Sequence, residues 1–149
     1  MPIRVPSTER CAFCDYLSGA RECAFIRRTD HVSSFINIRQ YERGALLVIP
    51  NDHFSTALDL DMELLGDIQS EAVLLGRALI RAFGATGLNI FQNNGVDAGQ
   101  TEPHYHVHVV PRYPGSDPHR VFHSRDFQPV PLTDQLEIAA AVCQALSAN

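Results

Sequence analysis

Two short apolar runs rich in β-branched residues flank a turn in the first third of the chain. They are Val32–Ile38 and Ala45–Pro50, and the polar, glycine-containing segment Arg39–Gly44 separates them. Runs of this length and composition, divided by turn residues, are typical of paired antiparallel strands. The pattern therefore predicts two neighbouring strands here, and Ala24–Arg28 is a candidate for a further strand at the edge of the pair.

From Asp61 onward every third or fourth residue is apolar, until Gly84 and Gly87 interrupt the pattern. This spacing places the apolar side chains on one face of a helix, and Asp59 or Asp61 is a suitable N-cap. We therefore expect one long amphipathic helix in the middle of the chain. Its predicted buried face consists of Leu64, Ile68, Ala72, Leu75 and Leu79.

Two more strands and a second helix complete the predicted secondary structure. The strands are Leu88–Gln92 and His104–Val110, the second of them closed by Pro111, and the helix begins at Thr133. Strands grouped around one long helix predict an α+β domain with an antiparallel sheet, one long helix and one C-terminal helix. The predicted buried face of the C-terminal helix is Leu136, Ala140, Cys143 and Leu146.

Length and composition favour one globular domain over residues 1–149. The chain is 45% hydrophobic and 19% charged, which is ordinary for a single domain of this size. Its formal net charge of −5 argues against a nucleic-acid duplex as partner. No run approaches the ~20 apolar residues of a membrane-spanning helix, and no signal-like segment opens the chain, so a cytoplasmic protein is expected. All 12 basic residues are arginine, which excludes lysine-dependent chemistry.

The segment PHYHVHVVPR at 103–112 carries three histidines at alternate positions. In a strand, His104, His106 and His108 share one face, while Val107 and Val109 point toward the core. Two chemistries fit this row. A pair of strand histidines can bind a metal ion together with ligands from elsewhere. Alternatively, one imidazole attacks a phosphorus atom, because imidazole is nucleophilic near neutral pH, and its neighbours handle protons and phosphate charge.

The histidine row and its flanks resemble the histidine triad (HIT) family. The sequence HYHVHVV at 104–110 fits the family's pattern of three histidines separated by apolar residues, and GQT at 99–101 and the segment 44–50 are similar to its other signatures. The resemblance covers residues 11–112 and leaves 113–149 as a C-terminal extension without a recognisable motif. It implies a homodimeric α+β fold that binds a purine nucleotide and cleaves at its α-phosphorus through a nucleotidyl-histidine intermediate.

The same resemblance implies roles for individual residues. His106 is the expected nucleophile, and His108 is expected to contact the phosphate and to assist the leaving group. The preceding loop offers amide, hydroxyl and glycine N–H donors suited to a small anion, and the expected phosphate-binding residues in it are Asn93, Gln100 and Thr101. The expected nucleoside-binding residues are Phe35, Asn37 and Ile38, although Asn37 fits equally well as a turn residue that ends its strand.

A C-x₂-C pair, Cys11 and Cys14, has the spacing with which two thiolates reach one zinc ion. The candidates for the remaining two ligands are His31, His53, His104, His119 and His123. Some bacterial HIT proteins, and the related galactose-1-phosphate uridylyltransferases, resemble this chain in having such a pair and a zinc ion bound by two histidines. On that resemblance the expected ligands are Cys11, Cys14, His53 and His104, a complete set that makes the zinc ion structural.

One position departs from the family pattern. Ala45 stands where the family often has a fourth histidine, which pairs with the first histidine of the triad. A zinc ion on His104 would orient that ring without the missing partner, so we expect the alanine and the C-x₂-C pair to be connected.

The expected activity is that of a nucleotide hydrolase or nucleotidyl transferase acting on nucleoside phosphoramidates or diadenosine polyphosphates. Three alternatives stay open on the sequence. The first is a diadenosine polyphosphate phosphorylase, which uses phosphate in place of water. The second is a nucleotide-binding sensor or scaffold without turnover, and the third is a metal-binding module that uses all three triad histidines as ligands.

Overall fold

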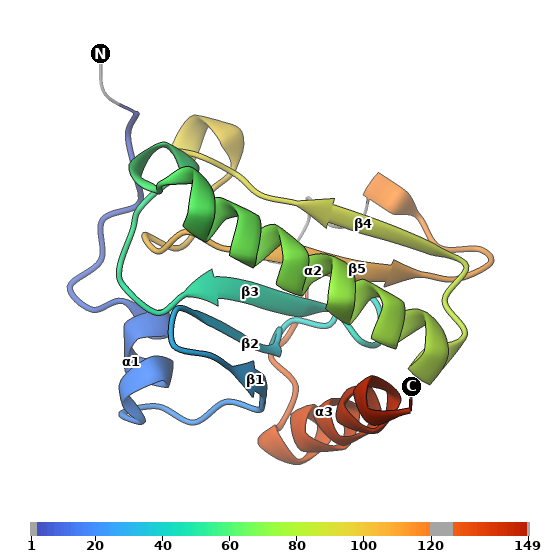
Figure 1. Ribbon diagram of the computed structural model, residues 1–149. Helices are drawn as coiled ribbons and strands as arrows, with labels where there is room; N and C mark the ends of the chain where they lie inside the picture. The colour runs from blue at the N-terminus through green and yellow to red at the C-terminus, as the bar shows by residue number, and fades with distance from the viewer. Residues whose placement is uncertain (1–2, 120–126, 149) are drawn as a thin grey trace.

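Five antiparallel strands form one sheet in the computed structural model, which describes residues 3–119 and 127–148 (Figure 1). In chain order they are β1 (Phe25–Arg28), β2 (Val32–Ile36), β3 (Leu46–Pro50), β4 (Gly87–Phe91) and β5 (Val107–Arg112). Their order in the sheet is β1-β2-β3-β5-β4, so β1 is an edge strand, as predicted, and β5 lies between β3 and β4. The α+β class with an antiparallel sheet is confirmed.

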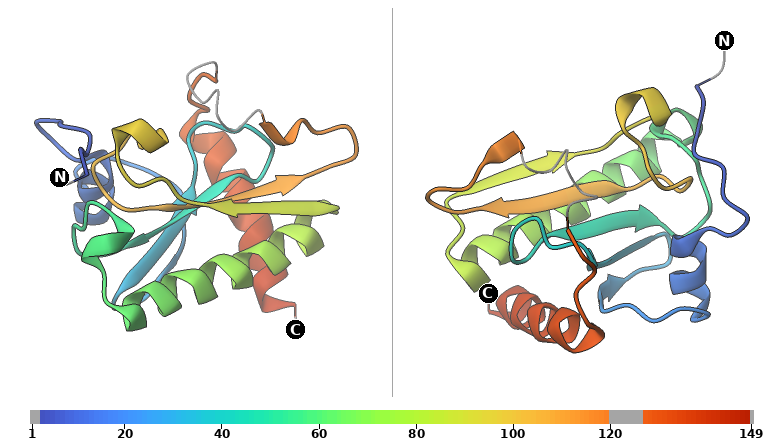
Figure 2. Two further views of the ribbon diagram at one scale, coloured as in Figure 1. Left: turned by 90° about the horizontal axis from the view of Figure 1, so that it is seen from above. Right: turned by 180° about the vertical axis from the view of Figure 1, so that it is seen from behind.

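The two faces of the sheet are covered unequally. The long helix α2 (Met62–Phe83) and the C-terminal helix α3 (Leu132–Ser147) pack on one face, and the short helix α1 (Ala12–Ser18) lies at one end of the other (Figure 2). Two short 3₁₀ turns, Ala57–Asp59 and Val96–Ala98, precede α2 and β5. Within the described residues, no helix is both long and apolar enough to cross a bilayer.

The long helix has the bounds that its sequence predicts. Asp61 is the N-cap, and its carboxylate accepts a hydrogen bond from the Leu64 N–H, while Gly84 ends the helix in the left-handed conformation with φ 66°. Of the predicted apolar face, Ile68, Ala72, Leu75 and Leu79 are buried and Leu64 is partly buried. This face packs on the sheet against the inward-pointing side chains of β2, β3 and β5.

The predicted bounds of the histidine strand are wrong at both ends. Regular pairing begins at Val107, because the Tyr105 N–H turns to the carbonyl of Phe54 (2.6 Å) ahead of the strand. The strand also continues through Pro111, which is paired with Leu88 of β4. Proline is accommodated there because β3 pairs only with Val107–Val109, so Pro111 needs no partner on that side.

The predicted buried face of α3 is wrong in part, since Leu146 packs partly buried against the core but two other members do not. Leu136 is 52% exposed and Ala140 is exposed, whereas Gln135 is buried. Gln135 uses both ends of its amide, because its oxygen accepts from the Ala24 N–H and its nitrogen donates to the Val130 carbonyl. A pattern of apolar residues does not reveal a buried glutamine whose amide oxygen and nitrogen are both hydrogen-bonded. The buried face consists of Gln135, Ile138, Ala139, Val142 and Ala145.

The packing of α2 predicts a large cost for Leu75→Ala. Leu75 is fully buried between α2 and the sheet, so truncation should lower the free energy of unfolding by about 2–5 kcal/mol. Denaturant unfolding monitored by circular dichroism measures this change. Leu58, which is 75% exposed, provides the control, and Leu58→Ala should change stability by less than about 0.5 kcal/mol. Equal effects of the two substitutions would contradict this packing.

Candidate functional site

Four side chains of the types that ligate metal ions meet where β3 ends. Cys11 and Cys14 belong to the start of α1, His53 follows β3, and His104 precedes β5. Their ligand atoms all lie within 4.8 Å of one another. His104 Nδ1 is 3.6 Å from each of the two sulfur atoms, and His53 Nδ1 is 3.3 Å from Cys14 Sγ. The sequence prediction named this same group of four residues.

The spacing of these atoms fits a zinc ion. A tetrahedral ion with Zn–S bonds of about 2.3 Å and Zn–N bonds of about 2.0–2.1 Å separates sulfur from nitrogen ligands by about 3.6 Å. Burial lowers the pKa of His104 to about 4 and raises the pKa of Cys14 to about 11, so the imidazole is neutral and the thiol is protonated in the absence of a cation. A bound cation favours the thiolate, which couples metal binding to proton release.

A hydrogen bond to the backbone fixes which ring nitrogen of His104 carries the proton. Its Nε2–H donates to the carbonyl of Pro50 (2.9 Å), since a carbonyl oxygen can only accept. The other nitrogen, Nδ1, therefore carries its lone pair on the side of the two cysteines. The ring is 0% exposed and has no freedom to turn.

His106 is oriented by the backbone of His104. Its Nδ1–H donates to the His104 carbonyl (2.8 Å), which leaves the lone pair on Nε2. Phe13 of α1 packs edge-on against both rings, with centroids 5.9 Å from His104 and 5.2 Å from His106. Burial lowers the pKa of His106, so the ring is neutral and its free nitrogen is available as a nucleophile.

His108 has a different environment. Its ring stacks on Phe91 with centroids 4.5 Å apart and an interplanar angle of 6°, and its centroid is 4.8 Å from that of His106. Within the described residues, its buried Nδ1 has no hydrogen-bond partner. The proton therefore belongs on Nε2, where it can meet an acceptor, because a buried N–H without one is costly. Burial lowers the pKa of His108 well below its usual value, so this ring is neutral as well.

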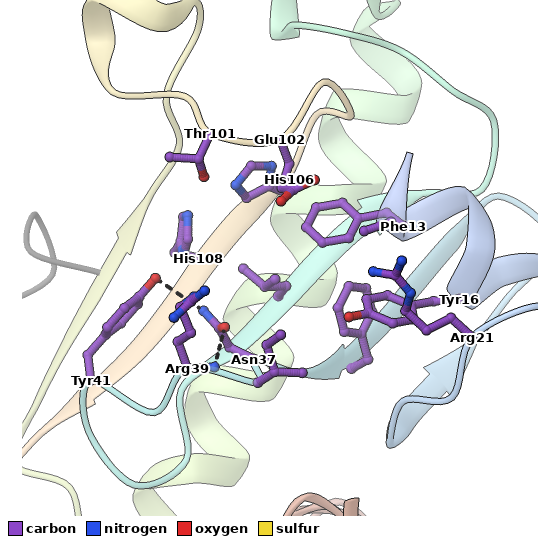
Figure 3. Close-up of a pocket in the computed structure, with 14 residues that line it drawn as sticks. Phe13, Tyr16, Arg21, Asn37, Arg39, Tyr41, Thr101, Glu102, His106 and His108 are labelled. Atoms are coloured by element: carbon purple, nitrogen blue, oxygen red, sulfur yellow. Dashed lines mark hydrogen bonds between the residues drawn. The ribbon is translucent and has the colours of Figure 1, made fainter. Parts of the chain in front are cut away.

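A cavity of about 270 Å³ opens beside the histidines on the face of the sheet away from α2 (Figure 3). At one end lie the aromatic rings of Phe13, Tyr16 and Phe35, which pack on one another with centroid distances of 5.4–6.1 Å. At the other end Tyr41 approaches His108, with ring centroids 6.3 Å apart. The predicted site residues that line the cavity are His106, His108, Thr101, Phe35, Asn37 and Ile38.

Gln100 and Asn93, two predicted phosphate-binding residues, do not line this cavity. The Gln100 amide oxygen accepts from the Gly95 N–H (2.7 Å), and its nitrogen donates to the carbonyls of Ser55 and Glu102, both at 2.8 Å. The Asn93 amide donates to the Gly99 carbonyl (3.4 Å). Both side chains therefore hold the shape of the loop that presents Thr101, and direct phosphate contacts by them stay a prediction.

Several residues that line the cavity are not predicted from the sequence. Phe13 and Tyr16 belong to α1, a helix of seven residues that is too short to show a periodic pattern. Their spacing of three residues, just after Cys11, is the one signal of a shared face. The remaining unpredicted lining residues with polar groups are Arg21, Arg39, Tyr41 and Glu102.

The expected connection between Ala45 and the cysteine pair is wrong. Ala45 lies just before β3. The cluster of cysteines and histidines lies at the other end of this strand, beside Pro50. Ala45 packs instead with Tyr41 and Val110. Two residues further on, Leu47 points to the same face of the sheet and is paired with His108. A side chain at position 45 therefore neighbours the third histidine of the row, and the orientation of the first histidine does not depend on it.

The other candidate zinc ligands are not part of this centre. His31 is exposed between β1 and β2, His119 is exposed beyond β5, and His123 lies outside the described residues. Over residues 3–119 and 127–148, neither His106 nor His108 joins a cluster of metal-binding side chains. The arrangement thus speaks against a module that uses all three histidines as ligands.

On this antiparallel sheet, a row of histidines lies between an open cavity and a cluster of four side chains of the types that ligate metal ions. This arrangement is that of a histidine triad protein. Residues 18–115 match the HIT domain, and the chain belongs to that family. It is 31% identical over 144 residues to the "Protein hit" of Bacillus subtilis, covering 95% of this chain and 97% of that relative. The crystal structure of a Zn-bound histidine triad family protein from Mycobacterium smegmatis matches with a TM-score of 0.79 and 30% identity, covering 92% and 93% of the two chains.

Two similar proteins from Schizosaccharomyces pombe are enzymes that act on nucleotides. Adenosine 5'-monophosphoramidase is 31% identical over 102 residues, which cover 68% of this chain and 74% of the relative. The asymmetrical bis(5'-nucleosyl)-tetraphosphatase is 36% identical over 85 residues, which cover 57% of this chain and 47% of the relative, so the match spans about half of that enzyme. The family relationship therefore supports, in broad terms, a nucleotide hydrolase or transferase.

The three hydrogen bonds of Gln100 predict that Gln100→Leu destabilises the loop. The change leaves the Gly95 N–H and two carbonyl groups without partners and should lower the free energy of unfolding by about 1–3 kcal/mol. Asn93→Leu removes one long bond on a less buried side chain and serves as the comparison. Amide hydrogen exchange at Gly95 should accelerate in the Gln100 variant. Unchanged exchange and stability there would rule out the loop-holding role.

Proposed function

We propose that this protein is a nucleotide hydrolase or nucleotidyl transferase in which His106 Nε2 attacks the α-phosphorus of a nucleoside phosphoramidate or a diadenosine polyphosphate. The observation that carries the proposal is the 2.8 Å hydrogen bond from His106 Nδ1–H to the His104 carbonyl. This bond fixes the tautomer with a free lone pair on the nitrogen that faces the cavity, so the nucleophile needs no separate base.

The cavity suits a purine nucleotide laid along its length. The base fits the aromatic end formed by Phe13, Tyr16 and Phe35, where flat rings offer stacking surfaces. Asn37 is the candidate for the ribose hydroxyls, and its amide is already oriented, because Oδ1 accepts from the Arg39 N–H and Nδ2 donates to the Tyr41 hydroxyl. This placement brings the α-phosphate to His106.

Attack forms a bond between His106 Nε2 and phosphorus and breaks the bond to the leaving group. The Nε2–H of His108 and the Thr101 hydroxyl, both at the cavity wall, donate hydrogen bonds to the phosphate oxygens as charge develops. Water then cleaves the nucleotidyl-histidine: its hydroxyl goes to phosphorus, the N–P electron pair returns to Nε2, one proton is released to solvent, and the nucleoside monophosphate departs. Use of two copies of the chain in this reaction stays a prediction from the family resemblance.

We also propose that Cys11, Cys14, His53 and His104 bind a structural zinc ion, which supplies the positive charge that keeps the two sulfurs as thiolates. The support is the 3.3–3.6 Å spacing of the ligand atoms and the Nδ1 lone pair of His104. Four protein ligands leave no position for substrate. The role of these residues is to fix α1, with its cavity residue Phe13, and the His104 backbone that orients His106.

His106→Ala should abolish turnover while leaving the fold and nucleotide binding intact. The loss of the nucleophile should lower kcat by at least about 1000-fold, measured as release of adenosine monophosphate from adenosine phosphoramidate and from diadenosine tetraphosphate. His31→Ala, an exposed histidine away from the cavity, should retain full activity. Full activity of the His106 variant would disprove the proposed mechanism.

Two further outcomes would replace the proposal with one of its alternatives. Binding of nucleotide without turnover of either substrate by the wild type would indicate a sensor or scaffold. Formation of adenosine diphosphate only when phosphate is added would indicate a phosphorylase, since phosphate would then replace water in the second step.

The zinc proposal predicts about one zinc ion per chain in protein purified without chelator or nickel affinity, with loss of the metal in a Cys11→Ser/Cys14→Ser double variant. Elemental analysis measures the content, and thermal unfolding should show a lower Tm for the variant. Cys23→Ser is the matched control, because Cys23 lies outside the cluster. Zinc retained at the wild-type level in the double variant would refute the assignment.

A further inference from the structure

Arg39 is a partly buried cation in the cavity wall. Its guanidinium donates to the carbonyl of Phe127, and within the described part of the chain no carboxylate lies within ion-pair distance of it. The other arginine of the wall, Arg21, has Asp15 at 3.8 Å. A guanidinium has five N–H donors in a fixed fork, so one bond to a carbonyl leaves most of them free for an anion in the cavity.

The position of Arg39 is at the end of the cavity away from the base-binding rings. It bonds to Phe127, whose ring packs edge-on against Tyr41, and Tyr41 in turn approaches His108. Figure 3 shows Arg39 on the same side of the cavity as Tyr41 and His108, with Phe13 and Tyr16 on the other. A group joined to an α-phosphate held between His106 and His108, whose ring centroids are 4.8 Å apart, therefore lies on the side of the cavity where Arg39 stands.

His108 is poorly suited to protonate a leaving group. Its ring is stacked on Phe91, and among the residues that the structure describes its buried Nδ1 finds no partner that would stabilise a second proton. Burial also lowers the pKa of this ring well below its usual value. An amine must take up a proton as it departs, whereas a phosphate or sulfate group departs as an anion and needs only its charge stabilised.

We propose that Arg39 forms an anion subsite for the leaving group and that the preferred substrates join the α-phosphate through oxygen to a second oxyanion, phosphate or sulfate. This inference rests on the proposed function and narrows its substrate class. The bond between His106 Nε2 and phosphorus forms while the bond from phosphorus to the bridging oxygen breaks. The electron pair stays on that oxygen, and Arg39 neutralises the resulting charge. Water then adds its hydroxyl to phosphorus, the N–P electron pair returns to Nε2, and a proton is released.

The test compares three substrates on three proteins. The substrates are diadenosine tetraphosphate, adenylyl sulfate and adenosine phosphoramidate, and the proteins are the wild type, Arg39→Gln and Arg43→Gln. Arg43 is an exposed arginine outside the cavity that pairs with Glu137 at 2.7 Å, so it controls for the loss of one positive charge. Arg39→Gln should lower kcat/KM for the anionic leaving groups by about 10- to 100-fold and for the phosphoramidate by no more than about twofold. Arg43→Gln should leave all three unchanged.

Equal losses on all three substrates would overturn the inference, because they would assign Arg39 a structural role through its bond to Phe127. An effect on tetraphosphate alone would support the subsite and identify phosphate as its ligand, and an effect on adenylyl sulfate alone would identify sulfate. No loss on either would overturn it.

Binding provides a readout that does not depend on turnover. In a His106→Ala background, Arg39→Gln should lower the affinity for adenosine triphosphate relative to monophosphate by about 10-fold. An unchanged ratio would overturn the subsite. Absence of turnover by the wild type, with this ratio still dependent on Arg39, would instead refute the proposed function and leave the subsite in place.

Discussion

The hydrogen bonds of His104 connect the two halves of this site. Through Nε2–H the ring is fixed to the Pro50 carbonyl, and through its own carbonyl the residue fixes the ring of His106. The first bond turns the Nδ1 lone pair toward the cysteines, and the second turns the Nε2 lone pair of the next histidine toward the cavity. One residue thus sets the tautomers on which both the proposed zinc site and the proposed nucleophile depend.

The unequal covering of the sheet explains why this arrangement is both rigid and accessible. On one face, α2 buries Val107 and Val109 of β5, which hold the strand in place, and α3 packs beside α2 over β1 and β2. On the other face the histidine side chains emerge beside α1, and its two aromatic residues, Phe13 and Tyr16, form the wall of the cavity. Because β5 is an interior strand, the backbone that carries His108 is paired on both sides, and its side chain projects from a rigid support.

The sequence predicts most of the elements but not all of their contacts. Periodicity identifies α2 because 22 residues repeat one pattern around a predominantly apolar face, and the alternation of histidines with valines predicts that Val107 and Val109 of β5 point into the core. It fails for α3, where the hydrogen-bonded Gln135 occupies a core position. Likewise, α1 is too short to show a helical repeat of apolar residues. Its contribution to the cavity wall is therefore found only in the structure, where the C-x₂-C pair lies beside His104.

Ala45 offers no polar group at the end of the cavity where the third histidine lies. Within the described residues the buried Nδ1 of His108 has no hydrogen-bond partner, so no described pair of side chains stabilises a proton there. The neighbouring Glu102 is partly buried and its pKa is raised by that burial, an effect that Arg21 and Arg39 oppose. With the described histidines of the cavity neutral, the fixed charges of the wall are those of the two arginines and the opposing Glu102. A site built in this way stabilises developing negative charge by preorganised donors, in contrast to one that transfers protons between side chains.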